Sequence, residues 1–307
     1  MHTKKLWIAG ETGMVGRALI RHFQDSKYEL LSAPHSILDL TNQSQTFHWL
    51  EKNKPDAVIM AAGRVGGIGA NASDRAGFLY ENTAMAQNVI HGSYKAGVKR
   101  LVYMGSSCVY PKEAEQPIRE EALLTAPLES TNEGYALAKI IGIKLCQYYQ
   151  QQYGVAYKAV MPCNLYGSYD HFDLNKSHVI PALILKIHWA KKQNVECVTL
   201  WGTGKPLREF LHVDDLAKAI ALILENKDQD PLINIGSGIE ISIKELALLI
   251  KETIGFTGEI IFDESKPDGT MRKVIDSSKV KSLGWKPNTL FEQGLSETYQ
   301  WYLKNVA

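Results

Sequence analysis

A tyrosine and a lysine four residues apart, Tyr135 and Lys139, have the residue types and spacing for acid–base chemistry. Side chains at this spacing lie on one face of a helix, so we expect the Lys139 ammonium beside the Tyr135 phenol. That charge should lower the phenol pKa from about 10 toward the working range of a general acid. Ser106 ends an apolar stretch about thirty residues earlier, and it can hold the substrate oxygen that receives the proton. Helices carry such pairs by chance as well, so the remaining sequence must decide.

Composition and charge narrow the class of protein. The chain has 307 residues, 45% of them hydrophobic and 22% charged, as expected of a soluble globular protein with one or two domains. A net charge of +1, with scattered lysines and arginines, predicts no nucleic-acid partner, and the apolar runs are too short to span a membrane. The N-terminus is typical of a first strand and not of a signal peptide. The cysteines show no metal-ligand spacing and predict free thiols in a reducing cytoplasm, without a metal site: Cys108, Cys146, Cys163 and Cys197.

Short apolar runs alternate with helical patterns through the first half of the chain. The expected strands are residues 6–9, 28–32, 57–60, 101–104 and 156–160. The expected helices are residues 15–23, 44–52, 78–95 and 135–153. Apolar strands separated by helices predict an α/β fold with a doubly wound parallel sheet, the Rossmann architecture.

The pattern changes after Pro162. Longer polar loops appear at 168–177, 202–208 and 265–273, with expected helices at 179–192 and 214–224. We therefore expect a dinucleotide-binding domain over residues 1–164 and a smaller α/β substrate-binding lobe over residues 165–307. A segment near 206–236 is expected to return to the first domain. Asp214 and Asp215 are expected to serve as an N-cap and a first-turn acid of the following helix, which is a structural role.

Three glycines follow the first expected strand directly. Gly10 allows a tight turn, Gly13 lets the backbone approach a pyrophosphate, and Gly16 allows close packing of helix on strand. The free amides at the following helix N-terminus favour phosphate. This arrangement predicts dinucleotide binding.

The choice between NAD and NADP depends on the end of the second strand, residues 32–36. NAD enzymes usually carry an acid there that binds the ribose 2′-hydroxyl, and this chain has none. It has no arginine there for a 2′-phosphate either. Asp39 comes too late for the ribose and is expected near the adenine. We expect a modest preference for NADPH, with NADH still accepted.

With the three glycines, Ser106, Tyr135 and Lys139 in this order, the chain resembles the extended short-chain dehydrogenase/reductases that act on nucleotide sugars. Finer segments resemble the GDP-L-fucose synthase family over about residues 5–303. Those segments are residues 62–71, 106–111, 128–139, 161–167, 177–182, 201–204, 208–215 and 265–273.

The chain also departs from the family's pattern. Ser130 and Met271 each stand where the family has proline, and both flank the chemistry. Glu11 and His35 stand where some bacterial members carry basic residues, which leaves the strictness of cofactor preference open.

The resemblance implies conversion of GDP-4-keto-6-deoxy-D-mannose to GDP-L-fucose, by epimerisation at C3 and C5 and then reduction of C4 with NADPH. It implies that Ser106, Tyr135 and Lys139 are catalytic, and it nominates Cys108 as base and His178 as acid. Taken alone, Cys108 is equally typical of a small buried residue, and His178 of a helix cap.

The resemblance further implies two sets of binding residues. The expected cofactor residues are Gly10, Thr12, Gly13, Met14, Val15, Gly16, Asp39, Leu40, Ala61, Ala62, Lys139, Pro162, Asn164, Leu165 and His178. The expected GDP-sugar residues are Lys186, Trp201, Arg208 and Asp268. Arg208 can donate two hydrogen bonds to a diphosphate, with Lys186 as a point charge beside it. Trp201 offers an aromatic face for stacking, and Asp268 can accept hydrogen bonds from hydroxyls. Asn164 could equally serve a turn, and each substrate residue could be ordinary packing.

Three alternatives remain open at this point. One is a C4-reductase, with or without epimerase activity, for a related GDP-4-keto-6-deoxy sugar of a heptose or colitose pathway. Another is an NAD-retaining sugar 4-epimerase, which needs neither Cys108 nor His178. The third is a dinucleotide-sensing module, for which Ser106, Tyr135 and Lys139 would have no use. The family resemblance also implies a homodimer, paired through the long helices at 78–95 and 135–153.

Overall fold

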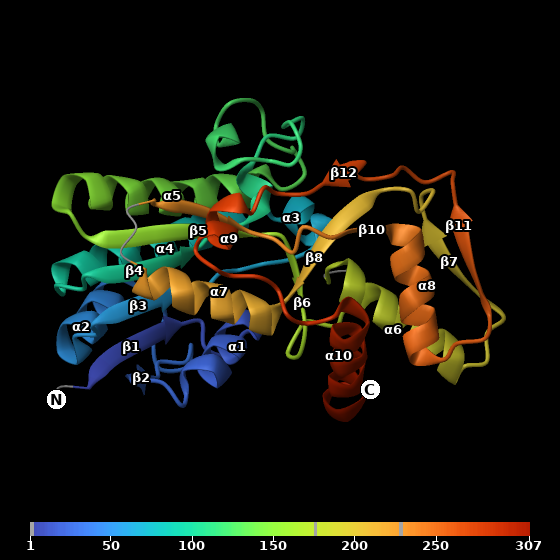
Figure 1. The fold of residues 1–307 in the computed structure, drawn as a ribbon, viewed down its shortest axis with the longest axis horizontal. Helices are drawn as coiled ribbons and strands as arrows, with labels where there is room; N and C mark the ends of the chain where they lie inside the picture. The colour runs from blue at the N-terminus through green and yellow to red at the C-terminus, as the bar shows by residue number, and fades with distance from the viewer. Residues whose placement is uncertain (1–2, 175–176, 227–229) are drawn as a thin grey trace.

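A six-stranded parallel sheet organises the first part of the molecule (Figure 1). The structure is a computed structural model and describes residues 3–174, 177–226 and 230–307. The strand order is β2-β1-β3-β4-β5-β9, with every neighbouring pair parallel. The strands are β1 Lys4–Ala9, β2 Tyr28–Leu31, β3 Ala57–Met60, β4 Arg100–Met104, β5 Ala156–Pro162 and β9 Leu232–Ile235. The predicted doubly wound sheet is confirmed.

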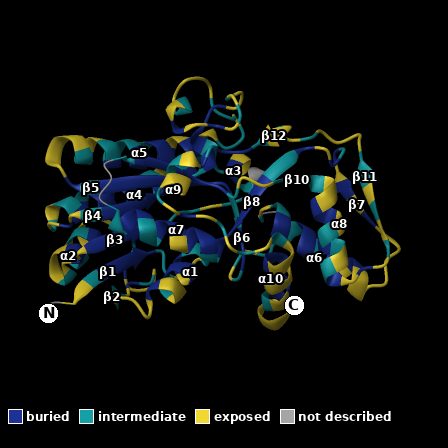
Figure 2. Cartoon of the chain, viewed as in Figure 1, coloured by how far each residue is buried: buried dark blue, intermediate teal, exposed yellow. Residues whose placement is uncertain are grey.

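Helices cover both faces of this sheet. The chain leaves β1 toward β2 and later returns past β1 to β3, so right-handed crossovers place the first helix opposite the next ones. The helices are α1 Met14–Phe23, α2 Gln43–Asn53, α3 Ile68–Ser73, α4 Arg75–Lys95, α5 Glu133–Tyr153 and α7 Val213–Glu225. Helix α4 packs between α2 and α5, whereas α7 packs on α1 and β4. Figure 2 shows the sheet strands buried between exposed outer faces of the helices.

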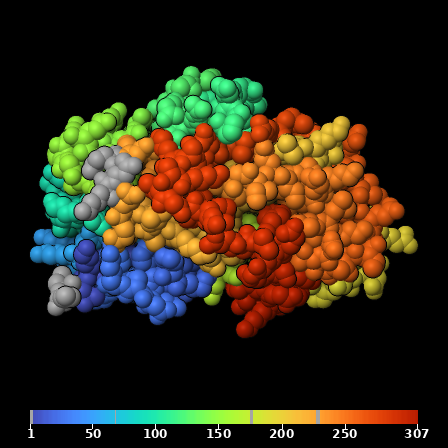
Figure 3. Space-filling view, viewed as in Figure 1, coloured from blue at the N-terminus to red at the C-terminus, as the bar shows by residue number. Residues whose placement is uncertain are grey.

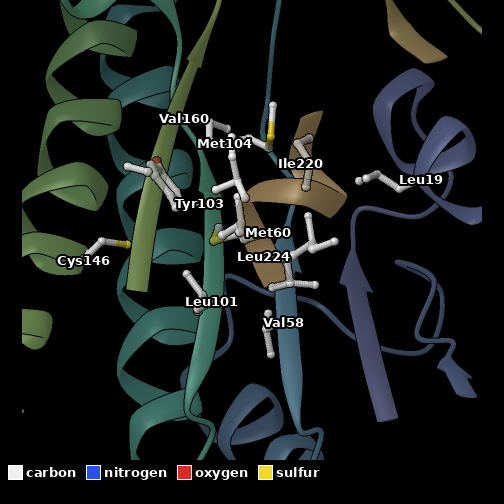
Figure 4. Close-up of a cluster of buried hydrophobic side chains, with 14 of the residues drawn as sticks. Leu19, Val58, Met60, Leu101, Tyr103, Met104, Cys146, Val160, Ile220 and Leu224 are labelled. Atoms are coloured by element: carbon white, nitrogen blue, oxygen red, sulfur yellow. The ribbon is translucent and has the colours of Figure 1, made fainter. Parts of the chain in front are cut away.

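The core between these layers is apolar and continuous. Every residue of β3 is buried, as expected for a strand covered on both faces. Figure 4 shows Val58 and Met60 of β3 beside Leu101 of β4, with Leu224 of α7 over them. Burial of this apolar surface holds the strands in position. It therefore also sets the positions of the polar residues that follow their carboxyl ends.

A second lobe has its own hydrophobic cluster, which includes Ile184, Leu246 and Tyr302. It occupies the right-hand side of Figure 1, and the C-terminal segment lies between the two lobes on the face drawn in Figure 3. Its elements are β6 Asn164–Tyr166, α6 Val179–Lys192, β7 Cys197–Trp201, β8 Leu207–His212, β10 Glu240–Ser242, α8 Ile243–Ile254, β11 Glu259–Asp263, β12 Arg272–Lys273 and α10 Phe291–Asn305.

The segment after β8 differs in detail from the sequence expectation. Strand β9 extends the main sheet beside β5 and was not foreseen. The cap of α7 is His212, whose Nδ1 accepts from the Asp214 amide, so the expected N-cap at this pair of aspartates is wrong. The expected acid in the first turn is confirmed, because Asp214 and Asp215 both lie there. Asp215 lies in the first turn, where its buried carboxylate accepts from the Asn288 and Thr289 amides. The domain boundary at 164/165 stays a prediction, and residues 175–176 of the expected loop at 168–177 lie outside the described part.

No helix in the described part of the chain is both long and apolar enough to cross a membrane.

Candidate active site

The glycine loop lies where the strand order reverses, between β1 and β3, the position at which folds of this kind bind ligands. Gly10 has φ +91°, and a Cβ there would lie 2.5 Å from the Ala62 nitrogen. A Cβ on Gly16 would lie 2.1 Å from the Gly10 oxygen. Gly13 is the exposed N-cap of α1 and makes no side-chain cap bond, and a Cβ there would make only an ordinary contact, 3.7 Å from the Gly10 oxygen. The helix therefore presents uncapped amides to an open surface, which suits a pyrophosphate.

A cavity of about 320 Å³ opens at this edge of the sheet. The expected cofactor residues that line it are Gly10, Thr12, Gly13, Asp39, Leu40, Ala61 and Ala62. Asp39 accepts from both the amide and the hydroxyl of Thr41, and these bonds lower its pKa. The cavity thus fits the adenosine and phosphate end of a dinucleotide.

Several lining residues were missed from the expected set. They are Glu11, Ala33, Pro34, His35, Leu38, Thr41, Gly63, Arg64, Glu81 and Met85. Position directly after β2 was a usable signal for Ala33, Pro34 and His35. Glu81 and Met85 lie one turn apart on α4, and only the tertiary position of α4, packed between α2 and α5, brings them here. The other expected residues do not line this cavity. They lie in the first turn of α1 (Met14, Val15, Gly16), on α5 (Lys139), at the end of β5 (Pro162), on β6 (Asn164, Leu165) and at the N-cap of α6 (His178).

Ser106, Cys108, Tyr135 and Lys139 gather where β4 and α5 meet. Ser106 follows β4 and caps the short 3₁₀ turn Ser107–Val109, where its hydroxyl accepts from the Cys108 amide at 3.2 Å. The Ser106 hydroxyl also hydrogen-bonds the Tyr135 side chain. Lys139 is buried and donates to the Met104 carbonyl at 2.8 Å, with its Nζ 5.6 Å from the centroid of the Tyr135 ring. The sequence expectation that these side chains meet is therefore confirmed.

The pKa of Tyr135 differs from the expectation. Burial and the nearby Cys108 raise the pKa of Tyr135, and the Ser106 hydrogen bond opposes this rise only in part. Burial also lowers the pKa of Lys139 to about 8. The expected lowering of the phenol pKa by Lys139 is wrong for this structure because desolvation dominates, and because the ammonium bonds the Met104 carbonyl. Tyr135 is thus protonated at neutral pH and can donate.

A loop after β3 lies between this cluster of side chains and the cavity. A Cβ on Gly63 would lie 3.3 Å from the Lys139 Nζ and 3.1 Å from the Asn82 Oδ1. The buried Asn82 amide holds this loop, because it accepts from the Arg64 amide and donates to the Arg64 carbonyl. Asn82 was missed by sequence reasoning. Its signal was its spacing, since it lies four residues from both Phe78 and Ala86 on the buried face of α4.

His178 and Asn164 lie in the second lobe, and neither is among the described residues that line the cavity at the glycine loop. His178 is the N-cap of α6, its side chain makes no cap bond, and burial by surrounding protein lowers its pKa. Asn164 donates to the Glu209 carbonyl at 2.9 Å, so it joins β6 to β8.

A smaller hollow of about 100 Å³ in the second lobe contains most of the expected GDP-sugar residues. Trp201, Arg208 and Asp268 line it together with Gly204, Pro206, Ile243, Pro267 and Gly269. Trp201 is 73% exposed, which leaves an aromatic face free to stack. Lys186 is not among the described residues that line this hollow.

Two of these side chains already have intramolecular partners. The two Asp268 oxygens accept from the amide and hydroxyl of Thr203, at 2.9 and 2.7 Å. The Arg208 Nη1 donates to the carbonyls of Leu207 and Thr270. These bonds hold the guanidinium at the hollow, where it is available to an anion.

Comparison with known proteins assigns the fold and site to a class. A family described as "NAD dependent epimerase/dehydratase family" matches residues 6–236. The chain therefore belongs to the NAD dependent epimerase/dehydratase family.

Within this family, the chain is 52% identical over 304 residues to a GDP-L-fucose synthase of Sinorhizobium fredii, covering 99% of this chain and 97% of that one. It is 40% identical to a GDP-L-colitose synthase of Yersinia pseudotuberculosis, covering 97% and 98%. A GDP-L-fucose synthetase from Naegleria fowleri bound to NADP has a similar structure, with a TM-score of 0.91, 30% identity and coverage of 99% and 95%. The family resemblance inferred from the sequence is confirmed.

Proposed function

We propose that this chain is an NADPH-dependent GDP-L-fucose synthase. It converts GDP-4-keto-6-deoxy-D-mannose to GDP-L-fucose by epimerising C3 and C5 and then reducing C4. The observation that carries the proposal is the thiol of Cys108 beside Tyr135 and Ser106. A 4-epimerase needs the serine, tyrosine and lysine but no added base, whereas a 3,5-epimerase does.

Epimerisation starts at the carbons next to the C4 ketone, whose protons the carbonyl acidifies. Cys108 removes a proton from C3 or C5, and the negative charge moves onto the ketone oxygen as an enolate. Tyr135 and Ser106 stabilise that oxygen by donating hydrogen bonds. His178 returns a proton to the opposite face of the ring, which inverts the centre.

Reduction uses the same oxygen-binding pair. NADPH, when bound, supplies hydride to C4, and Tyr135 donates its proton to the resulting alkoxide. The lowered pKa of Lys139 places its titration near 8, so near neutral pH its ammonium supports the negative charge that Tyr135 then carries. Arg208 and Trp201 bind the GDP end of the substrate.

A second candidate function is reduction of a related GDP-4-keto-6-deoxy sugar, and the similarity to a GDP-L-colitose synthase supports it. The test compares kcat/KM for GDP-4-keto-6-deoxy-D-mannose with that for the colitose-pathway and heptose-pathway substrates, using NADPH. The proposal predicts the highest value for the first substrate, with GDP-L-fucose as product. A higher value for either alternative would replace the proposal.

We further propose that the protein is cytoplasmic and a homodimer, paired through α4 and α5. Support for the dimer comes from large side chains exposed on these helices: Tyr80 at 72%, Tyr148 at 53% and Tyr153 at 50%. Tyr148 also lies three helical turns from the exposed Leu137, so both occupy one face of α5.

A further inference from the structure

A carboxylate lies at the end of β2, although the residues that follow this strand, 32–36, contain no acid. Strand β2 ends at Leu31, and Ser32 and Ala33 follow it directly. In dinucleotide-binding sheets of this kind, residues at this position read the 2′ position of the adenosine ribose, with an acid for a hydroxyl and a base for a phosphate. This chain has neither acid nor arginine among residues 32–36.

Glu11 of the glycine loop reaches this strand end. Its Oε1 accepts from the Ser32 hydroxyl at 2.7 Å, and its Oε2 accepts from the Ala33 amide at 3.3 Å. Glu11 also lines the cavity beside Ala33 and His35. The carboxylate that NAD enzymes usually carry on β2 is thus supplied here from the β1–α1 loop.

The charges around the cavity add to this effect. Among the described lining residues, Glu11, Asp39 and Glu81 are acidic and Arg64 is the single arginine. Arg64 is itself paired, with Glu81 at 3.1 Å and Asp74 at 2.7 Å. A 2′-phosphate at this position would be repelled by the Glu11 carboxylate. The Ser32 hydroxyl and the Ala33 amide, which could donate to that phosphate, already donate to Glu11. A 2′-hydroxyl can instead donate to Glu11.

We propose that Glu11 determines dinucleotide specificity in this chain: it weakens binding of the 2′-phosphate and makes NADH a working cofactor beside NADPH. This inference rests on the proposed dinucleotide-dependent function. It assigns the discrimination to a residue of the glycine loop, away from the reacting atoms, so it predicts a change in binding without the sugar substrate.

The test measures Kd for NADPH and for NADH by fluorescence titration, with no sugar present, in the wild type and in Glu11→Gln. Glu11→Gln keeps the shape and removes the charge. Glu29→Gln is the matched control, because Glu29 is exposed on β2, does not line the cavity and carries the same charge. Glu11→Ala serves as a second variant and also frees the Ser32 and Ala33 donors.

The wild type should bind the two dinucleotides within about tenfold of each other. Glu11→Gln should tighten NADPH binding about tenfold, the effect of one charge-assisted contact, while NADH binding stays equal or weakens. Glu29→Gln should change neither. An unchanged Kd ratio in both Glu11 variants would overturn the role of Glu11 and leave the proposed function standing. Failure of the wild type to bind either dinucleotide would overturn both.

Discussion

At the scale of single residues, the proposed mechanism assigns Cys108 to epimerisation alone. Cys108 lies two positions after Ser106 in the turn that follows β4, and the proposed reduction uses only Ser106, Tyr135 and Lys139. We predict that Cys108→Ser slows exchange of the C3 and C5 protons with solvent deuterium about a hundredfold, the usual contribution of a general base. Reduction of C4 should continue and give a sugar with uninverted centres.

The measurement is NMR of the substrate in D₂O without NADPH, followed by product analysis after NADPH is added. Cys197→Ser is the control, since Cys197 is exposed on β7 in the second lobe. Normal exchange in Cys108→Ser would remove this thiol from the mechanism.

Lys139 links the chemistry of the site to stability. Its pKa is about 8 in the folded protein and 10.5 when unperturbed, so between these values the unfolded state binds more protons and stability rises with pH. We predict that the unfolding free energy of the wild type, relative to Lys139→Met, rises by about 3 kcal/mol from pH 8 to pH 10.5. Because Lys139 is only 4% exposed, we expect solvent screening to reduce this change in unfolding free energy only slightly. Urea unfolding of both proteins across this range tests it, and parallel pH curves would contradict it.

At the scale of elements, Glu209 joins three segments of the chain, namely its own strand, the loop after β9 and the segment after β12. It lies on β8, is fully buried, and accepts from the Gly238 amide at 2.6 Å and the Ile275 amide at 3.1 Å. The amide of Glu209→Gln has one acceptor oxygen, so one backbone donor would lose its partner. We predict a loss of about 1–3 kcal/mol in unfolding free energy.

Urea midpoints of Glu209→Gln and of Glu252→Gln, an exposed position on α8, provide the comparison. Equal stability of the two variants would show that the carboxylate is not needed to join these segments.

The elements themselves were predictable to different degrees. Strands β1 to β5 and helices α1, α2, α4 and α5 were readable, because each strand is a short apolar run and a helical pattern follows between strands. Helix α3 was missed. Strand β9 was missed because Leu232–Ile235 follows a long excursion of the chain and pairs with β5 only in three dimensions.

The site residues, like the elements, were predictable only in part. Ser106, Tyr135 and Lys139 follow from strand ends and helical spacing, whereas the Glu11 bonds to Ser32 and Ala33 join loops from two different crossovers. The raised pKa of Tyr135 needed the burial that only the packed structure shows.

For the whole molecule, we predict the oligomeric state. If α4 and α5 form the dimer interface, a charge placed on that face should separate the subunits, because burying an unpaired charge is costly. We predict that the wild type sediments at twice the chain mass of 34.3 kDa at micromolar concentration, and that Tyr148→Glu sediments as a monomer. Leu248→Glu, exposed on α8, should remain dimeric. A monomeric wild type would rule out the dimer.

We propose that one site of this protein performs both epimerisation and reduction. The most direct measurement incubates the protein with GDP-4-keto-6-deoxy-D-mannose and NADPH in D₂O, and identifies the product by NMR while oxidation of NADPH is followed. We predict GDP-L-fucose that carries deuterium at C3 and C5, with one NADPH oxidised for each sugar formed. A C4-reduced product without deuterium at these carbons would show that the chain is a reductase alone and would contradict the account.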